Sequence, residues 1–538
     1  MVLTYSTGLF IFRGTTYEDR LTPKNAGLTW NPAKRQWETK DFEAAAELMP
    51  YADCSAVEAI NANRAEMQKK INESRAVEVD LDICCPPDLS YLNYQKAGIA
   101  ALIARRNALL ADEMGLGKTV QAAGLINYLQ PSNVLIVCPA GLKINWQREL
   151  EKWLVAQRNI LIVDGRGPLV LGDGGIIICS YEMLSKHREI IQGRWDLFVM
   201  DECHYLKNSK AQRTRAAFAV KASRKLAMTG TPILNRPVEI QPILAYLDAP
   251  FAKNWRDFVL RYCGAYFTKY GWVTDGATNV QELGDRMRGS VMIRRQKQDV
   301  LTELPPKRRQ IVEISSDSGD LKAQIDRERS FVQKTAKELA VIRGQVAAAK
   351  AKADADKYRD AVKKLRIARK AQFEEMAMLR HETALMKVPF AADMIVDALK
   401  SVDKLVVFAH HHDVILRIQK ELSRNGVSCV TATGETPVAE RQNAIDRFQN
   451  DAVHVFLGSI QACGTGITLT AASHVIFVEF DWTPSRMTQA EDRCHRIGQR
   501  DIVFVQHLVV DGSIDAQLAK VLVRKQDIID AILDTKIP

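Results

Sequence analysis

The sequence predicts an α/β fold with two parallel-sheet lobes, helical insertions between them and a small N-terminal α+β module. From about residue 87 to 245, short apolar runs alternate with helical stretches, which is typical of a parallel sheet covered by helices on both faces. The same alternation returns from about 388 to 510. Between them, residues 318 to 385 are rich in Ala, Lys, Arg and Glu and contain no proline, which predicts one or two long helices, such as a hairpin.

The composition is that of a globular protein with several cores. The 538 residues are 47% hydrophobic and 26% charged, so disorder is not expected. Lysine and arginine total 74 against 64 aspartate and glutamate residues, which gives a net charge of +10. That excess favours a polyanionic partner if it gathers on one face, but composition does not distinguish this from an even spread.

Cysteine usage and hydropathy indicate a soluble protein of a reducing compartment. The 10 cysteines are scattered, several lie in apolar runs, and none has metal-ligand spacing. No apolar run approaches the ~18 residues that span a bilayer, and the N-terminus lacks the pattern of a secretion signal. We therefore expect buried thiols and an intracellular location.

Residues 1–86 are expected to form the N-terminal accessory module. Leu9 to Arg13 is an aromatic, strand-like stretch, and a helix is expected to begin near Asp41. Trp30 and Trp37 flank a predicted turn. Two tryptophans in a small domain are more often core residues than a surface for forked or single-stranded DNA, which is the alternative.

The other boundaries follow changes of pattern along the chain. We expect the first lobe at 87–245, helical insertions and a linker at 246–387, the second lobe at 388–510 and a C-terminal helix at 511–538. Residues 246–310 read as mostly helical. The charges on the long helices that follow are more simply explained as a solvated face than as an arm that contacts DNA.

An apolar strand, a glycine loop and a helix follow one another around residues 109 to 119. In that context, backbone N–H groups and the helix N-terminus hold phosphates, so Lys118 is expected to reach the β and γ phosphates of ATP and Thr119 to bind Mg²⁺. A structural turn with the same letters is the alternative, and the flanking strand and helix disfavour it. One departure is Asp112, which stands where the usual leading glycine is missing. The nucleotide-binding residues predicted in this loop are Asp112, Gly115, Leu116, Gly117, Lys118 and Thr119.

An acidic pair ends the predicted strand that begins at Trp195. Asp201 at the end of a strand beside the phosphate loop is placed to hold the Mg²⁺ ion, and Glu202 is placed to polarise the attacking water. Such a pair is usually a surface turn, but its position about eighty residues after the glycine loop favours catalysis. Gln95 precedes the loop at the distance where related ATPases read adenine with a side-chain amide.

Two arginines of the second lobe complete the predicted catalytic set. Arg493 and Arg496 are three residues apart, so on a helix both would lie on one face and point into a cleft. An arginine at the γ phosphate stabilises the charge that develops during hydrolysis. The alternative is a helical salt-bridge cluster with Glu491 and Asp492.

These motifs and their order resemble those of the Swi/Snf family of superfamily-two helicase-like ATPases, over about residues 88 to 510. The resemblance implies two RecA-like lobes. Arg294 and Arg295, and the string Phe408 to His411, are most similar to the annealing-helicase branch, the HepA-related proteins. The further matching motifs are Val137 to Ala140 with Trp146, Cys179 to Tyr181, Leu226 to Pro232 with Asn235, Gly458 to Leu469, Trp482 to Pro484 and Gln489 to Gln499.

The resemblance also implies roles for residues that match the family's motifs. Gly466 and Gln489 would contribute to the nucleotide site, and Thr229 and Thr231 would couple the nucleotide state to the DNA track. The residues expected near the duplex backbone are Lys143, Trp146, Ser180 and Tyr181 in the first lobe and Gln461, Thr468 and Trp482 in the second. Lys143 as a solvated lysine and Trp146 as a core residue are equal alternatives. Contacts of this kind bind DNA with little sequence preference.

The expected function is a DNA-dependent ATPase that translocates on double-stranded or forked DNA, with annealing or fork remodelling as its output. Three alternatives remain open: an ATP-gated binding scaffold, an RNA-directed helicase and the motor subunit of a restriction or defence complex. Intact Lys118, Asp201, Glu202 and Arg496 disfavour the scaffold.

The compact plan suits a bacterial or phage motor that works with replication or repair proteins. Its expected location is cytoplasmic, or nuclear in a eukaryotic source. Both expectations are analogies drawn from the family.

Overall fold

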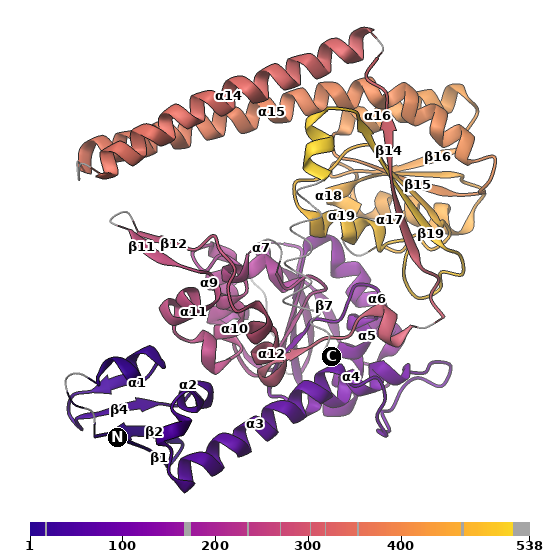
Figure 1. Ribbon diagram of the computed structural model, residues 1–538. Helices are drawn as coiled ribbons and strands as arrows, with labels where there is room; N and C mark the ends of the chain where they lie inside the picture. The colour runs from indigo at the N-terminus through magenta and orange to yellow at the C-terminus, as the bar shows by residue number, and fades with distance from the viewer. Residues whose placement is uncertain are drawn as a thin grey trace. The chain divides into compact units, whose positions relative to one another are not determined.

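The computed structural model describes residues 1–14, 16, 19–165, 174–233, 236–268, 271–301, 303–317, 319–351, 355–463 and 467–519 (Figure 1). These residues fall into two compact units, one ending at Leu301 and one beginning at Glu303. The first unit holds the N-terminal module and the first parallel sheet, and the second holds the other parallel sheet and two long helices. Among the described residues, no helix combines the length and apolar character needed to cross a membrane.

The N-terminal module is a four-stranded antiparallel sheet with strand order β1-β2-β4-β3. Its strands are β1 (Val2–Ser6), β2 (Leu9–Arg13), β3 (Thr29–Asn31) and β4 (Gln36–Thr39). The strand predicted at residues 9 to 13 and the helix start near Asp41 are confirmed, since the Asp41 carboxylate caps α2 (Phe42–Ala46).

The two tryptophans of this module face each other across the hairpin of β3 and β4, but only one belongs to its core. Trp37 is 9% exposed, whereas Trp30 is 42% exposed. The prediction that both are core residues is therefore wrong for Trp30, because β3 is an edge strand. From this module α3 (Cys54–Arg75) leads to the first parallel sheet and packs on α12 (Val280–Ser290).

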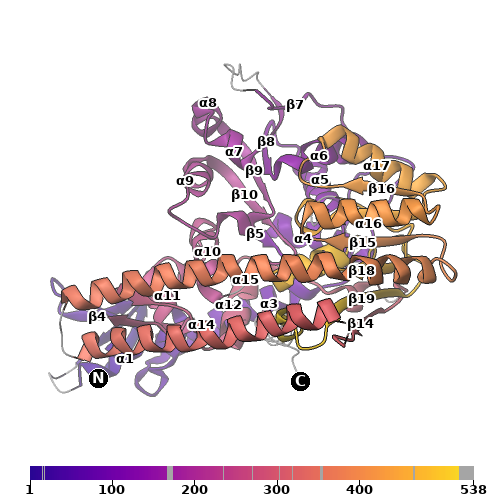
Figure 2. The same cartoon turned by 90° about the horizontal axis from the view of Figure 1, so that it is seen from above.

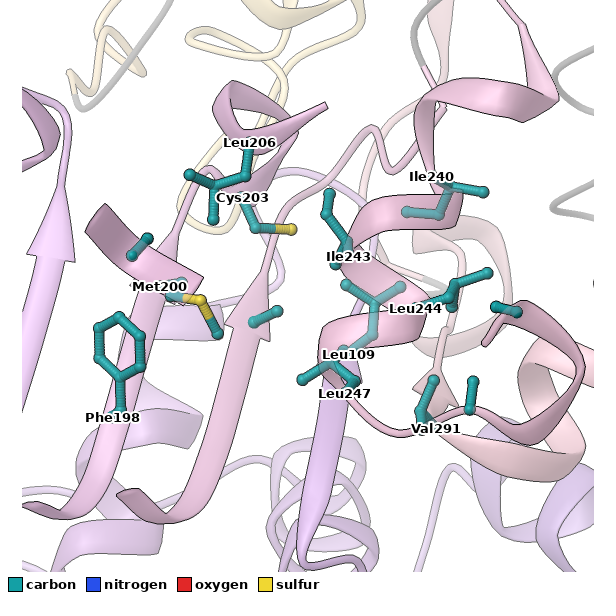
Figure 3. Packing of buried hydrophobic residues seen from close by; sticks show 14 of the residues in the cluster. Leu109, Phe198, Met200, Cys203, Leu206, Ile240, Ile243, Leu244, Leu247 and Val291 are labelled. Carbon is teal, nitrogen blue, oxygen red and sulfur yellow. The ribbon is translucent and has the colours of Figure 1, made fainter. Parts of the chain in front are cut away.

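The first parallel sheet has seven strands in the order β13-β5-β10-β9-β6-β8-β7. Alternate side chains of its central strands enter two hydrophobic clusters: Leu109 and Leu135 belong to one, and Leu110 and Ile136 to the other. Figure 3 shows part of the first cluster, where α10 (Gln241–Tyr246) packs near Leu109 of β5. The strands are β5 (Asn107–Leu110), β6 (Asn133–Cys138), β7 (Ile160–Ile162), β8 (Gly175–Ser180), β9 (Arg194–Asp201), β10 (Lys221–Met228) and β13 (Met292–Ile293).

The helices that accompany this sheet include those that carry the expected site. They are α4 (Asn93–Ala104), α5 (Lys118–Leu129), α6 (Lys143–Trp153), α7 (Tyr181–Leu184), α8 (Arg188–Gln192), α9 (Gln212–Ala219) and α11 (Trp255–Tyr262). Because all seven strands run parallel, the loops after β5, β9 and β10 lie at the same edge of the sheet.

The second unit contains a six-stranded parallel sheet in the order β14-β19-β18-β15-β17-β16. Two of its inner strands, β15 and β17, are fully buried, as expected for a sheet covered on both faces. The strands are β14 (Lys307–Ile314), β15 (Leu405–Ala409), β16 (Cys429–Ala432), β17 (Val455–Ser459), β18 (His474–Phe477) and β19 (Val503–Val510). The predicted fold class, with two parallel-sheet lobes and a small N-terminal module, is confirmed.

The region 246–310 is less helical than predicted, because it also contributes strands. β11 (Tyr266–Thr268) and β12 (Gly271–Val273) form a hairpin, while β13 and β14 are edge strands of the two parallel sheets. The sequence pattern did not predict these two edge strands, for different reasons. β13 has only two residues, and β14 begins Lys-Arg-Arg-Gln and is largely exposed.

The predicted pair of long helices is confirmed. α14 (Gly319–Ala351) and α15 (Ala355–Ala398) lie side by side in both views (Figures 1 and 2). Gln372 donates to the Thr335 hydroxyl across the pair at 3.2 Å, and Gln324 donates to the Leu379 carbonyl at 3.1 Å.

Candidate active site

The loop between β5 and α5 has the backbone geometry that a phosphate site requires. Gly115 and Gly117 both adopt the left-handed region, with φ of 85° and 71°. α5 begins at Lys118, so the amides of its first turn, including that of Thr119, have no carbonyl partner within the helix. The first turn of α5 is therefore suited to bind an anion.

Lys118 reaches back over this loop from the start of α5. Its Nζ donates to the carbonyl oxygens of Asp112 and Glu113 at 2.9 and 3.3 Å. Burial lowers the pKa of Lys118, while the carboxylates of Glu202, Asp112 and Asp201 oppose that shift.

Gln95 lies against the loop, where it was expected. Its Nε2 is 3.5 Å from the carbonyl oxygen of Leu116, and a Cβ atom added at Gly117 would come within 2.6 Å of the same nitrogen. Its Oε1 accepts the N–H of Leu92 and so closes the first turn of α4. Gln95 is thereby fixed by its own helix and touches the phosphate loop.

Asp112 has a different role from the predicted one. Its carboxylate is fully buried and accepts from the Arg295 guanidinium, with Nη2 to Oδ2 at 2.8 Å and Nε to Oδ1 at 3.0 Å. The backbone N–H of Arg295 and the Gln121 amide also donate to it. The prediction that Asp112 binds nucleotide is wrong for its side chain, because the carboxylate is occupied in holding the loop onto the segment after β13.

Asp201 ends β9, and both oxygens of its carboxylate accept hydrogen bonds. Trp146 donates its indole N–H to Oδ2 at 2.9 Å, and the N–H of Glu202 donates to Oδ1 at 2.9 Å. Burial and then the charge of Glu202 raise the pKa of Asp201 to about 6. A cation at this carboxylate would relieve both effects, which fits the predicted Mg²⁺ ligand.

Glu202 sits in the left-handed region, with φ of 50° and ψ of 49°, a conformation that costs a side-chain-bearing residue roughly 1 to 2 kcal/mol. Its Oε2 lies 3.3 Å from the Thr229 hydroxyl and 3.2 Å from His204 Nδ1. The Thr229 hydroxyl in turn accepts the N–H of Thr231 at 3.1 Å. The predicted base and the two threonines therefore form one connected group.

Gly230 brings this group against the phosphate loop. A Cβ atom added there would come within 2.4 Å of Met114 Cγ and 3.3 Å of Lys118 Nζ. The loops after β5, β9 and β10 thus converge on one place, as the sequence predicted for Lys118, Asp201 and Glu202.

Four residues expected at the DNA are buried in the first lobe. Trp146 is 1% exposed, Tyr181 donates its hydroxyl to the Asp201 carbonyl at 2.7 Å, and Ser180 caps α7. Hydrophobic packing and polar contacts within the lobe enclose Trp146, Ser180, Tyr181 and Thr229, so Trp146 is a core residue, and a place for these four near a duplex stays a prediction. Lys143 is half-buried and pairs with Asp164.

Arg493 and Arg496 do not lie on a helix as predicted, because α19 (Pro484–Glu491) ends before them. They still converge: Arg493 and Arg496 donate to the carbonyl oxygen of Ile467 at 3.5 and 3.2 Å. Gln489 is buried in α19, and its carbonyl accepts from Arg493 Nε at 3.1 Å. Gly466 lies outside the described residues.

The acidic residues before these arginines are engaged by the edge strand β14. Arg309 binds Glu491 with two nitrogens, and Lys307 contacts both Glu491 and Asp492 at 2.8 and 2.9 Å. The cationic β14 residues hold the pKa of Glu491 well below its usual range, against the effect of burial.

The remaining second-lobe candidates differ in their surroundings. Gln461 is exposed, and Thr468 accepts a hydrogen bond from Arg496 at 2.8 Å. Trp482 is half-buried between the Arg380 guanidinium, 4.3 Å from its ring centre, and the Phe373 ring at 5.0 Å.

Several residues of the site were not predicted from the sequence. Arg294 donates to the carbonyl oxygen of Ala111 at 2.8 Å, and Arg295 also donates to the Tyr94 carbonyl at 2.6 Å. His204 bridges Glu202 and Thr229. The family resemblance singled out Arg294 and Arg295, but nothing in the sequence tied them to a loop 183 residues away.

Comparison with known proteins agrees with this geometry. The SNF2-related domain matches residues 65–372, and the helicase conserved C-terminal domain matches residues 387–498. The SWI/SNF-related matrix-associated actin-dependent regulator of chromatin subfamily A-like protein 1 homolog of Caenorhabditis elegans is 32% identical over 94% of this chain and 71% of its own length. The DNA annealing helicase and endonuclease ZRANB3 of Homo sapiens is 31% identical over 82% of this chain and 40% of its own.

The subfamily A-like protein 1 of Xenopus tropicalis is 33% identical over 79% of this chain, and the chain spans 43% of that protein's length. The SWI2/SNF2 ATPase core of Sulfolobus solfataricus in complex with dsDNA matches with a TM-score of 0.40 and 22% identity, covering 85% of this chain and 95% of that one. These relatives give no support to the expected bacterial or phage origin. With its phosphate loop, acidic pair and second-lobe arginines in the expected order, the chain belongs to the SNF2-related family of helicase-like ATPases.

Proposed function

We propose that this protein is an ATP-driven motor that moves along or remodels double-stranded or forked DNA. The observation that carries the proposal is the convergence of Lys118, Asp201, Glu202 and Thr229 from the ends of β5, β9 and β10. A site that only senses ATP has no need of a carboxylate held beside the phosphate loop by a strained backbone.

The phosphate loop is proposed to bind ATP through the backbone N–H groups at the start of α5. Lys118 would exchange its two carbonyl contacts for phosphate oxygens, which restores a charge partner to a buried ammonium group. Gln95, already against the loop, has the amide needed to recognise adenine. The Thr119 hydroxyl and the Asp201 carboxylate would hold Mg²⁺, which when bound neutralises charge on the transferred phosphoryl group.

Glu202 is proposed to orient and polarise the attacking water. Its Oε2 is held by Thr229 and His204, so the carboxylate keeps one direction. A change in the water or phosphate at Glu202 would reach Thr231 through the Thr229 hydroxyl. This chain of contacts supports the role proposed for the two threonines, which is to couple nucleotide state to the DNA track.

Arg493 and Arg496 are proposed to stabilise the developing charge on the γ phosphate. Both guanidinium groups are already directed to the segment at Ile467, so one movement of that segment would present them together. Of the residues first expected at the duplex, Thr231, Lys143, Gln461, Thr468 and Trp482 remain the proposed DNA contacts.

The names of the relatives support DNA as the proposed substrate and annealing or remodelling of strands as the proposed activity. ZRANB3 is named a DNA annealing helicase, which is consistent with a motor that rejoins or remodels strands. We propose annealing or fork remodelling on this ground, with replication or repair proteins as partners.

Steady-state ATP hydrolysis tests the proposal directly. Turnover is measured for the protein alone and with duplex, forked and single-stranded DNA and with RNA. We expect the strongest stimulation with duplex or forked DNA. The Glu202→Gln variant should bind ATP without hydrolysing it, while Glu151→Gln, which changes an exposed glutamate of the same lobe, should behave as wild type.

Two results would contradict the proposal. Wild-type turnover in Glu202→Gln would remove its assignment as the group that activates water. An active site that hydrolyses no ATP with any nucleic acid would favour the gated scaffold, and stimulation by RNA alone would favour an RNA-directed enzyme.

A further inference from the structure

The net positive charge of the chain is concentrated in residues 334 to 370, which include the end of α14 and the beginning of α15. Residues 334 to 370 contain 12 lysines and arginines and four acidic residues, which is a net charge of +8 out of +10 for all 538 residues. The rest of the two helices, residues 319 to 333 and 371 to 398, contains five basic and eight acidic residues. A merely solvated pair of helices has no reason to separate its charges in this way.

The basic residues of α15 form a stripe, defined as Arg359, Lys363, Arg366 and Lys370. Their spacing of four, three and four residues places them on one face of the helix, and all four are exposed. They cover about 17 Å along the helix axis, a length over which duplex DNA carries roughly ten phosphate charges.

The stripe faces away from α14. The side of α15 that packs on α14 is marked by Ala361, which is 7% exposed, and by Gln372, which bonds to Thr335. Lys363 and Lys370 each lie two positions from one of these residues, which is about 200° around the helix. The stripe is therefore open to a large partner. Lys370 lies 3.6 Å from the exposed Glu374, whereas no ion pair of Lys363 or Arg366 is found among the residues the structure describes.

The stripe leads toward a residue already proposed to contact DNA. Phe373 follows Lys370 by one helical turn, is 50% exposed, and its ring centre lies 5.0 Å from that of Trp482. Arg380, seven residues further along α15, places its guanidinium 4.3 Å from the centre of the Trp482 ring. The hairpin is thus joined to the body of the second lobe at Trp482, and the stripe continues from that point outward along α15.

We propose that the stripe is a second contact surface for the phosphate backbone of duplex DNA, outside the ATPase site. The inference rests on the proposed function, because the motor must act on DNA for the stripe to have this partner. Its contacts are ionic and directed to phosphates, so they add affinity and not sequence preference. It assigns to the hairpin a role as a DNA-binding arm, where the sequence favoured a solvated face.

The test compares two triple variants of the full-length protein. The stripe variant is Lys363→Ala, Arg366→Ala, Lys370→Ala. The control variant is Arg417→Ala, Lys420→Ala, Arg424→Ala on α16 (His412–Arg424), which removes the same charge at the same helical spacing from exposed positions of the same unit. A charge-preserving variant, Lys363→Arg, Arg366→Lys, Lys370→Arg, separates loss of charge from loss of fold.

Affinity for a short duplex is measured over a salt series, together with ATP turnover without DNA. If all three residues contact phosphates, the stripe variant should lower the slope of log affinity against log salt by about 2.7 and weaken binding roughly tenfold at physiological salt. Turnover without DNA should not change, and the α16 control and the charge-preserving variant should keep the wild-type slope.

The outcomes separate this inference from the proposed function. A stripe variant with the wild-type slope, or one that loses no more than the α16 control, overturns the arm while DNA-stimulated turnover of the wild type stands. A stripe variant that loses affinity for RNA and keeps it for the duplex overturns the choice of partner. Wild-type turnover that no DNA stimulates contradicts the proposed function itself.

Discussion

Arg295 and Asp112, 183 residues apart in the chain, form a bidentate ion pair that fastens the phosphate loop to the segment after β13. Both side chains are almost completely buried, and Gln121 contacts each of them. This ion pair therefore positions the loop that is expected to hold ATP, although the pair itself need not contact ATP. The missing leading glycine of the loop is explained by the same contact, since a glycine there would leave Arg295 unpaired.

Replacing Arg295 by alanine should destabilise the first unit strongly. It leaves the Asp112 carboxylate buried without its charge partner, and breaking a buried pair in this way costs about 3 to 5 kcal/mol. Urea unfolding measures the change. The double variant Arg295→Ala, Asp112→Ala should recover part of the loss, and a double variant that loses the sum of both single effects would show that the two side chains act independently.

Gly98→Ala should be destabilising although it lies within a helix. A Cβ atom at Gly98 would come within 1.9 Å of Gln121 Oε1 and 2.5 Å of Arg295 Nη2, so the network must shift, at about 1 to 3 kcal/mol. The matched control is Gly344→Ala in α14, where nothing lies within 4 Å and stability should rise by about 0.5 to 1 kcal/mol. Thermal unfolding of both variants decides, and equal shifts would contradict the prediction.

Trp146→Phe should move the acid limb of the pH profile of kcat/KM to higher pH. The indole N–H stabilises the ionised form of Asp201, and a hydrogen bond to a charged group is worth about 1.5 to 3 kcal/mol. Without it, the pKa of Asp201 rises further above its present value of about 6. Trp153→Phe, in the same helix and stacked on Tyr91, should leave the profile in place. An unchanged profile in Trp146→Phe would remove the proposed link to the metal ligand.

Asp201→Asn should stabilise the protein without nucleotide at alkaline pH. The pKa of Asp201 is raised from 3.8 to about 6 in the folded state, so folding takes up a proton between these values and wild-type stability falls as pH rises through them. The asparagine variant escapes this cost, of order 3 kcal/mol above pH 6, and the difference vanishes below about pH 4. Unfolding over a pH series measures it. Mg²⁺ with ATP should reverse the order by stabilising only the wild type, and a variant less stable at every pH would contradict the prediction.

The parts of the fold that sequence predicts are those with a strong local pattern. Strands such as β6 and β15 are nearly continuous apolar runs, and α14 and α15 contain long stretches of strong helix formers. β13 has two residues and β14 alternates little, so their places at the sheet edges depend on pairing with β5 and β19 and not on their own composition.

The residues of the candidate site likewise divide into those that a local pattern predicts and those whose position depends on other elements. Lys118 follows β5 after a short loop, Asp201 ends β9 and Glu202 comes directly after it, so the edge of a parallel sheet brings the three together. Trp146 and Tyr181 are large aromatic residues whose burial is decided by neighbours from other elements, here Asp201 and Tyr205. The charges near Arg493 could be counted from the sequence, but their pairing with β14 could not.

The chain segment between Arg295 and Lys307 is anchored at both ends by ion pairs with residues in or beside the candidate site. Its first end is locked to the phosphate loop, and its second end is locked to Glu491 and Asp492, directly before Arg493. Because both anchors are buried charge pairs, a pull on this segment would act at the glycine loop in one unit and directly before Arg493 in the other.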